Sequence, residues 1–353
     1  MIYMISLLAT ALCAVGIVRW RSFFETLTEH RADNIAIQSS HCGDPLRFGG
    51  LAVFIGLGFG TFLLLWDLGG NRATLLVLSS LPVAIAGLAE DMGYRVSPRG
   101  RLVAAMVSAL TAIALLQMWI PRADLAGLDF VLAFPAIAIA GTILFSACYC
   151  HSLNLIDGMN GLATVAAITA ATGIATIATI AGQAEIATFA ILLIACLIGF
   201  LLLNWPSAHL FLGDAGAYAI GHLLVWLCII LANVSQDIAI PALLLVLFWP
   251  LADVFHTIYR RAILSKSLFQ PDKMHLHHKV RRALDLVVFG YNQRAKSNPS
   301  TTAVLLPFMI MPVATGVLLW NDPREAWLAF FAFLIAFALA HKVATGIAVK
   351  YRK

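Results

Sequence analysis

Long apolar runs recur along the whole chain of 353 residues and decide what it can fold into. An α-helix needs about 20 apolar residues to cross the ~30 Å hydrocarbon core of a bilayer. Eleven runs of roughly this length cover residues 1–18, 48–66, 73–89, 102–120, 128–147, 161–182, 186–203, 215–233, 238–258, 303–320 and 326–347. The sequence therefore predicts an all-α polytopic integral membrane protein with about eleven transmembrane helices.

The composition excludes other classes of protein. Hydrophobic residues make up 61% of the chain and charged residues only 12%, about half the charged share of a soluble domain. The apolar runs do not alternate with polar residues, as the strands of a membrane barrel would. None of the six cysteines forms a C-x-x-C pair, so we expect neither zinc nor disulfides. We treat residues 1–353 as one membrane-embedded domain.

Lysine and arginine are distributed unevenly among the connectors. If the N-terminus lies outside, 19 of the 23 basic residues fall in connectors on the inside. Cytoplasmic loops of membrane proteins carry such an excess. We therefore expect an uncleaved first span, the N-terminus outside, the C-terminus in the cytoplasm, and no nucleic-acid partner despite the net charge of +5.

Two adjacent acids, Glu90 and Asp91, end the third apolar run. Neighbouring carboxylates can bind a metal ion or raise the pKa of one another. Because a helix C-terminus does not favour anions, the pair needs a partner of opposite charge. The alternative is a solvated helix end that pairs with Arg95, Arg99 or Arg101.

Polar residues also follow the fifth run. Asn154, Asp157 and Asn160 recur at intervals of three, and Gly158 permits a tight turn and close approach of the backbone to a ligand. The connector 148–160 contains no lysine or arginine that could neutralise Asp157. It is either a substrate-binding loop or a plain interfacial turn.

Two further carboxylates stand near the eighth and ninth runs. Asp214 follows Phe211 and is either a metal ligand or the N-cap of the next helix. Phe211 is either a stacking ring or a membrane anchor. Asp253 lies inside the ninth run, where an ionisable residue suggests function, although it could simply pair with Arg260.

Three of the ten histidines, His275, His277 and His278, fall within four residues of the longest inside connector. A zinc site usually takes four well-spaced Cys or His ligands, whereas the neighbouring Lys279 and Arg281 suit phosphate. A solvated basic loop attracted to anionic lipid is the alternative. With the carboxylates, this cluster suits a metal-bridged polyphosphate handled at the bilayer surface.

In this order the motifs resemble the polyprenyl-phosphate N-acetylhexosamine-1-phosphate transferase family, within glycosyltransferase family 4. The resemblance runs from Pro45-Leu-Arg-Phe-Gly49-Gly50 through residues 154–161 and 211–214 to 275–278. The family includes the phospho-MurNAc-pentapeptide translocase of peptidoglycan synthesis and enzymes that initiate O-antigen and related glycans. Here a glutamate and an asparagine, Glu90 and Asn160, stand at two aspartate positions of the family.

A third departure is the His-x-His-His order of the cluster. The three together indicate a glycan initiator rather than the peptidoglycan translocase. The resemblance implies transfer of N-acetylhexosamine 1-phosphate from a UDP-sugar such as UDP-GlcNAc to undecaprenyl phosphate, with release of UMP. It also implies Mg²⁺, with Mn²⁺ as a substitute, membrane lipids as partners, and a bacterial inner membrane with the active site on the cytoplasmic face. It leaves open whether the chain forms an oligomer.

The resemblance also assigns roles to residues. The metal ligands it implies are Asp214 and Asp91. The substrate-binding residues are Asn154, Gly158, Asn160, Phe211, Arg101 and Asp253. The catalytic residues are Glu90, Asp91, Asp157, His275, His277 and His278.

A secondary transporter for an anionic metabolite is the main alternative function. The acid inside the ninth run and the basic inside connectors support it. The gathering of polar residues on one face opposes it, because transporter sites lie near the middle of the membrane. A non-catalytic lipid-binding scaffold is a third interpretation, and release of UMP from a UDP-sugar would exclude both.

Overall fold

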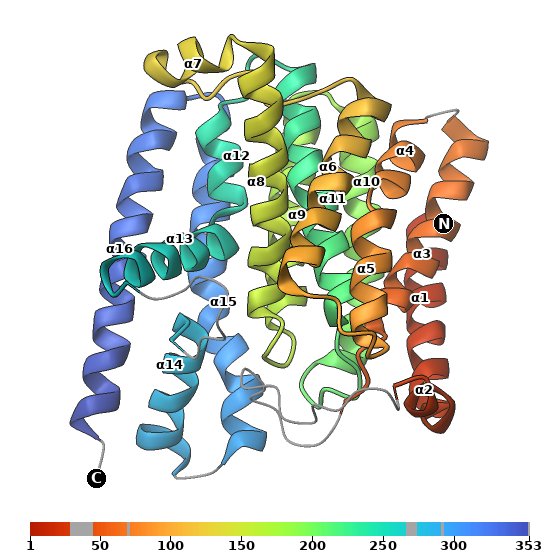
Figure 1. The fold of residues 1–353 in the computed structure, drawn as a ribbon, viewed down its shortest axis with the longest axis vertical. Helices are drawn as coiled ribbons and strands as arrows, with labels where there is room; N and C mark the ends of the chain where they lie inside the picture. The colour runs from red at the N-terminus through yellow and green to blue at the C-terminus, as the bar shows by residue number, and fades with distance from the viewer. Residues whose placement is uncertain (29–44, 69–70, 266–273, 291–292, 352–353) are drawn as a thin grey trace.

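The computed structural model describes residues 1–28, 45–68, 71–265, 274–290 and 293–351. These residues form a bundle of helices (Figure 1). Its first part contains α1 (Ile2–Arg19), α2 (Arg21–Thr26), α3 (Gly49–Leu68), α4 (Arg72–Ser79), α5 (Leu81–Asp91), α6 (Pro98–Leu116), α7 (Ala126–Leu132), α8 (Pro135–Ile156) and α9 (Leu162–Ile180). Its second part contains α10 (Ala184–Asn204), α11 (Gly213–Val234), α12 (Ile240–Val246), α13 (Phe248–Ile263), α14 (Leu276–Leu284), the π-helical turn η1 (Asp285–Phe289), α15 (Arg294–Leu318) and α16 (Pro323–Lys350).

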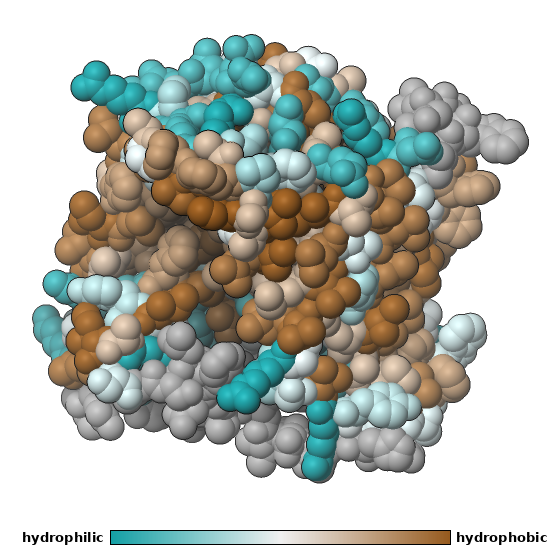
Figure 2. Space-filling view, turned by 45° about the horizontal axis from the view of Figure 1, so that its top comes forward, coloured by the Kyte–Doolittle hydropathy of each residue, from teal (hydrophilic) through white to brown (hydrophobic). Residues whose placement is uncertain are grey.

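The predicted all-α membrane class is confirmed. Among the described residues, nine helices are long and apolar enough to cross a membrane, with α4 and α5 forming one of them, and α12 with α13 makes a tenth if the bent pair crosses as one. In α3 the apolar stretch is shorter, Gly49–Leu64. Figure 2 shows a broad hydrophobic band across the middle of the visible face, with hydrophilic residues gathered above it. The structure thus supports nine or ten spans of the eleven predicted.

The ninth predicted run, 238–258, is not one straight helix. It is broken at Leu247 into α12 and α13, which are bent by 86°, so that α13 lies across the bundle (Figure 1). Pro250 is the third residue of α13. A proline in the first helical turn lacks only an N–H that would have no partner there, so it favours a new helix start at this point.

The fifth predicted run, 128–147, is also divided differently. Pro135 is the first residue of α8, and a short separate helix, α7, precedes it. At the other end α8 continues to Ile156. Asn154 therefore lies on the last turn of α8 and Asp157 directly after it.

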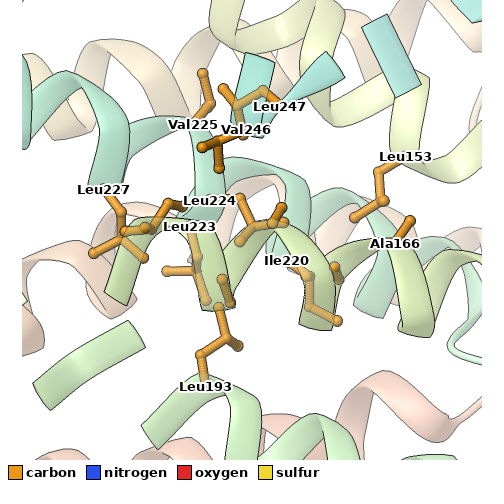
Figure 3. Close-up of a cluster of buried hydrophobic side chains, with 14 of the residues drawn as sticks. Leu153, Ala166, Leu193, Ile220, Leu223, Leu224, Val225, Leu227, Val246 and Leu247 are labelled. Atoms are coloured by element: carbon orange, nitrogen blue, oxygen red, sulfur yellow. The ribbon is translucent and has the colours of Figure 1, made fainter. Parts of the chain in front are cut away.

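The helix α11 forms the centre of the bundle. Its residues from Gly213 to Ala232 are all buried, because the sequence is apolar on every side of the helix and such a helix belongs in a core. Its side chains meet those of α8, α9 and α10 in the apolar cluster of Figure 3, which includes Leu153, Ala166 and Leu193. This packing against α8, α9 and α10 holds α11 in place.

The start of α3 packs against the start of α11 with almost no space between the backbones. A Cβ atom at Gly50 would lie 2.4 Å from the Cα of Gly216, so only glycine fits. The backbone amides of Gly49 and Gly50 donate to the carbonyls of Phe211 and Leu212, each at 2.8 Å. This pairing fixes the segment that leads into α11.

Candidate active site

Asp91, at the end of α5, is bound to the first turn of α11. The backbone N–H of Asp214 donates to its Oδ1 and the N–H of Ala215 to its Oδ2, both at 3.0 Å. The first N–H groups of a helix have no partner within the helix, and a carboxylate there is favoured by the helix dipole. Asp91, only 1% exposed, therefore caps α11 from another helix.

The carboxylate of Asp214 is left for another purpose. The N-cap position of α11 is Leu212, and no side chain of the helix itself makes the cap bond, so the N-cap interpretation of Asp214 is wrong. Its Oδ2 is instead in contact with Nη1 of Arg101, from the first turn of α6. The same Nη1 lies 3.9 Å from Oε1 of Glu90, so one guanidinium faces two acids.

Asp157 approaches the same point from the end of α8. The backbone amide of Gly213 donates to it, and burial raises its pKa well above the usual range. The positive charge of Arg47 acts in the opposite direction. Gly213 has φ of +72°, and a Cβ atom there would lie 2.6 Å from Oδ2 of Asp91. Only glycine lets these acids come so close.

Glu90 contributes a carboxylate oxygen with unmet bonding capacity. Its Oε2 is buried and has no hydrogen-bond partner among the described residues. A buried charged oxygen without a partner is costly and therefore suits a site that a cation occupies during the reaction. The structure thus brings Glu90, Asp91, Arg101, Asp157 and Asp214 together, as the sequence predicts. We call these five residues the carboxylate group.

Two residues that the sequence analysis did not single out border the carboxylate group. Tyr218, one turn after Asp214, hydrogen-bonds Asn154 and interacts with the charges of Asp214 and Arg101. The ring of His151 lies 4.8 Å from that of Tyr218, and its buried Nε2 has no partner in the described part of the chain. In the sequence, His151 could have been found as a polar residue one helical turn before Asn154.

Asn160 holds the connector between α8 and α9 in place. Its backbone N–H donates to Oδ1 of Asn298 at 2.8 Å, its Nδ2 donates to the carbonyl of Pro206 at 2.7 Å, and its carbonyl accepts from Oγ1 of Thr302 at 2.7 Å. Gly158 lies in the same turn. Asn160 therefore joins the α8–α9 turn to the segment before α11 and to α15. Substrate binding by Asn160, Gly158 and the buried Phe211 stays a prediction.

A second group of polar residues forms where α13, α14 and α16 meet. Nδ1 of His275 lies 2.6 Å from Oδ2 of Asp253, and the backbone N–H of Leu276 donates to Oδ1 at 3.3 Å. The rings of His277 and His278 follow, with centroids 4.3 Å apart. Asp253 is thus paired across helices with the predicted histidine cluster. We call Asp253 and the three histidines the histidine group.

His277 is the most enclosed member of the histidine group. It is 1% exposed, and neither ring nitrogen has a hydrogen-bond partner among the residues described. Burial, reinforced by the positive charge available to His278, lowers its pKa well below the usual range. His277 is therefore neutral and offers one N–H donor and one acceptor.

Two more histidines border this group, and His341 is the one that the sequence analysis missed. His256 of α13 and His341 of α16 stack on each other with ring centroids 3.7 Å apart. Nε2 of His341 lies 3.9 Å from Oδ1 of Asp253. A histidine inside the last apolar run was the only sequence signal for His341.

Comparison with known proteins finds a family model that matches the part of the chain around the carboxylate group. Residues 73–232 match the model of glycosyl transferase family 4. The chain is similar to this family over these residues. The match extends from α4 to α11 and contains the whole carboxylate group, whereas the histidine group lies after it.

Full-length relatives extend the similarity over most of the chain. A probable undecaprenyl-phosphate N-acetylglucosaminyl 1-phosphate transferase of Bacillus subtilis is 26% identical over 293 residues, covering 82% of this chain and 76% of the relative. The undecaprenyl-phosphate α-N-acetylglucosaminyl 1-phosphate transferase of Yersinia pestis is 27% identical, covering 82% and 78%. A decaprenyl-phosphate N-acetylglucosaminephosphotransferase of Mycobacterium tuberculosis is 26% identical, covering 79% of each chain.

The donor atoms of the carboxylate group are compatible with Mg²⁺. Mg²⁺ is usually held by one or two carboxylates together with substrate phosphates. Asp214 and Glu90 both lie beside Arg101, and Asp214 together with the unpartnered Oε2 of Glu90 can supply carboxylate oxygens. The oxygens of Asp91 already accept two backbone N–H bonds, so Asp91 is first of all the residue that holds α11 in place.

Proposed function

We propose that the protein transfers an N-acetylhexosamine 1-phosphate from a UDP-sugar to undecaprenyl phosphate, releases UMP and so starts a lipid-linked cell-envelope glycan such as an O-antigen. The observation that carries the proposal is that Glu90 and Asp214 share one guanidinium, Arg101, while Asp157 accepts from the backbone N–H of Gly213 at the capped start of α11. The relatives named above are, by their names, N-acetylglucosaminyl phosphate transferases that act on undecaprenyl or decaprenyl phosphate. UDP-GlcNAc is therefore the first donor to test.

In the proposed reaction an oxygen of the lipid phosphate attacks the β-phosphorus of the UDP-sugar. A new P–O bond forms there, the bond from that phosphorus to the bridging oxygen breaks, and UMP leaves with the electron pair. A phosphate monoester has a second pKa near 6 and is mostly dianionic at pH 7. It needs little help from a protein base, so catalysis rests on positioning and on neutralising charge.

The residues of the chain divide this work. Arg101 donates hydrogen bonds to phosphate oxygens, the histidines of the histidine group contact the same phosphates, and Asp214 with Glu90 would hold Mg²⁺. A bound Mg²⁺ supplies Lewis-acid stabilisation of the charge on the diphosphate. Asp91 keeps the first turn of α11 in position, and the α8–α9 turn, which Asn160 holds, borders the nucleotide.

The proposed location is the bacterial inner membrane, with the site on the cytoplasmic face. Its support is the concentration of basic residues in the connectors on one side and the hydrophobic band of the surface (Figure 2). The members of the carboxylate group lie at the ends of α5 and α8 and at the starts of α6 and α11. Sites at helix ends are more typical of an enzyme at the membrane surface than of a transporter.

The test is release of UMP by the purified full-length protein in lipid nanodiscs. UMP should appear only when UDP-GlcNAc, undecaprenyl phosphate and Mg²⁺ are all present, together with a lipid that carries the sugar phosphate. Other UDP-N-acetylhexosamines, tested in parallel, identify the preferred sugar. Absence of UMP with every such donor, or UMP formed without the lipid, would contradict the proposal and leave the transporter or scaffold.

A further inference from the structure

The last helix, α16, reaches into the histidine group. His341 lies on the inner side of α16, is 2% exposed, and places Nε2 3.9 Å from Oδ1 of Asp253. One turn later Oγ1 of Thr345 accepts a hydrogen bond from Nζ of Lys279 at 2.9 Å. Two contacts in successive turns therefore connect α16 to the histidine group and to the helix α14 that follows His275.

Asp253 determines which nitrogen of His275 is available to a substrate. A carboxylate only accepts hydrogen bonds, so Nδ1 of His275, 2.6 Å from Oδ2, must carry the hydrogen. Nε2 of His275 is then the nitrogen that can meet a phosphate oxygen or a proton. The orientation of the Asp253 carboxylate thus controls both the tautomer and the direction of this ring.

The second oxygen of Asp253 is held less firmly. Its partner in α14 is the backbone N–H of Leu276 at 3.3 Å, and Nε2 of His341 faces the same oxygen from the opposite helix. Distances of this kind are often long without substrate and shorten in the reacting complex. The stacked ring of His256, 3.7 Å away, fixes the plane of His341 and leaves Nε2 directed at Asp253.

If position 341 served packing alone, an apolar side chain would be more favourable there than a histidine. Both ring nitrogens of His341 are buried without a hydrogen-bond partner within the described ranges. Leaving such atoms unbonded is unfavourable. Phe337, one turn before it, shows that an aromatic hydrocarbon fits the same side of α16. The nitrogens of His341 therefore have a use other than packing.

We propose that His341 is a positioning residue for the transfer reaction, which holds Asp253 in the orientation that fixes His275. The proposal rests on the proposed function for the identity of the reaction, and His341 itself does not touch the reacting atoms. This role would make α16 part of the active site, although His341 lies about 63 positions after His278 along the chain.

Two substitutions separate positioning from packing. His341→Phe keeps the ring and its stacking but removes the nitrogens, and His341→Gln places an amide N–H near the position of Nε2. Phe330→Leu is the matched control, because Phe330 is 5% exposed on the same helix and lies about 16 Å from His341, toward the start of the helix. In His341→Phe we expect kcat to fall about tenfold or more and KM for either substrate to change less than about twofold.

The conservative variant should recover most of this loss. His341→Gln should keep at least about a third of the wild-type kcat, while Phe330→Leu should lower the melting temperature and leave kcat within about twofold. Wild-type kcat in His341→Phe would overturn the proposal. Equal losses in the Phe and Gln variants, with melting temperatures that fall as in Phe330→Leu, would overturn it too, because His341 would then be a packing residue.

A measurement without turnover distinguishes this proposal from the proposed function. In protein labelled with ¹⁵N-histidine, the His275 signals are assigned by their loss in His275→Gln. The wild type should show one tautomer with hydrogen on Nδ1, and His341→Phe should show exchange between both tautomers. An unchanged His275 spectrum in His341→Phe overturns the positioning role, whether or not any UDP-sugar yields UMP.

Discussion

The carboxylate group and the histidine group are built on different principles. In the carboxylate group the backbone does the holding: Asp91 accepts two amide bonds from the first turn of α11, and Gly213 donates to Asp157. In the histidine group one side chain holds another: Asp253 on α13 pairs with His275 at the start of α14, and the bordering His341 on α16 faces the same carboxylate.

The difference suggests a division of tasks. Backbone amides and the close packing at Gly213 leave the acids little freedom, which suits a fixed site for cation and diphosphate. Side chains of three helices, one of them bent by 86° from its neighbour, can change their distances at small cost. Such a group can tighten around a phosphate after it binds. Variants in the two groups should therefore fail in different ways.

The largest effect is expected from Asp91→Ala. It leaves two buried N–H groups of α11 without a partner, and each such group costs about 1–3 kcal/mol. We expect both a melting temperature several degrees lower and almost no UMP release. Asp322→Ala is the matched control, since Asp322 is an exposed cap that accepts from the N–H of Glu325 at 3.1 Å at the start of α16.

The control should cost about 1 kcal/mol of stability and leave activity unchanged. If Asp91→Ala melts like the wild type but needs far more Mg²⁺, then Asp91 is a metal ligand and not the cap of α11. That result would show that backbone hydrogen bonds to Asp91 are not what holds the carboxylate group together.

Asp214→Asn should reduce activity without the loss of stability. Asp214 makes no cap bond of its own, so the unfolding free energy should change by less than about 1 kcal/mol. We expect kcat to fall at least tenfold, equivalent to about 1.4 kcal/mol of transition-state stabilisation, with poor rescue by excess Mg²⁺. Retention of more than a tenth of kcat would show that the carboxylate charge is not required.

The apolar runs made the helical membrane class predictable, but the break at Leu247 could not be read from them. Prolines are tolerated inside spanning helices; α15 continues through Pro299, Pro307 and Pro312, whereas the chain bends just before Pro250. The same residue type gives both outcomes, because neighbouring helices decide whether the freed backbone groups find partners.

The candidate site was predictable where its residues belong to short motifs. Asp157, Asp214 and His275 each stand in a cluster of polar residues along the chain, and such clusters are visible without a structure. The cap formed by Asp91 joins residues 123 positions apart, and His341 is a single polar residue in an apolar run. Their roles depend on which helices pack together, and local sequence carries no record of that.

A smaller effect is expected from Glu90→Gln, which tests whether the unpartnered oxygen acts as a base. A phosphate monoester has a second pKa near 6 and is mostly dianionic at pH 7, so the lipid phosphate can attack without a protein base. We expect kcat to fall about tenfold, Glu90→Asp to be partly active, and the acid limb of kcat/KM to stay near pH 6. Disappearance of that limb in Glu90→Gln alone would make Glu90 the base.

The smallest effect concerns the buried neutral ring of His277. Because its pKa is lowered by burial in the folded protein and is about 6.5 in an unfolded chain, the unfolded chain takes up a proton first as the pH falls. The stability from His277 is therefore complete above about pH 6.5 and is lost below it, by up to about 1.4 kcal/mol per pH unit. The melting temperature of His277→Leu should drop less than that of the wild type between pH 7.5 and 5.5, and the exposed His209 provides the control, His209→Leu. Equal drops in wild type and His277→Leu would mean that protons reach the ring freely, and the histidine group would then be open rather than closed around its core.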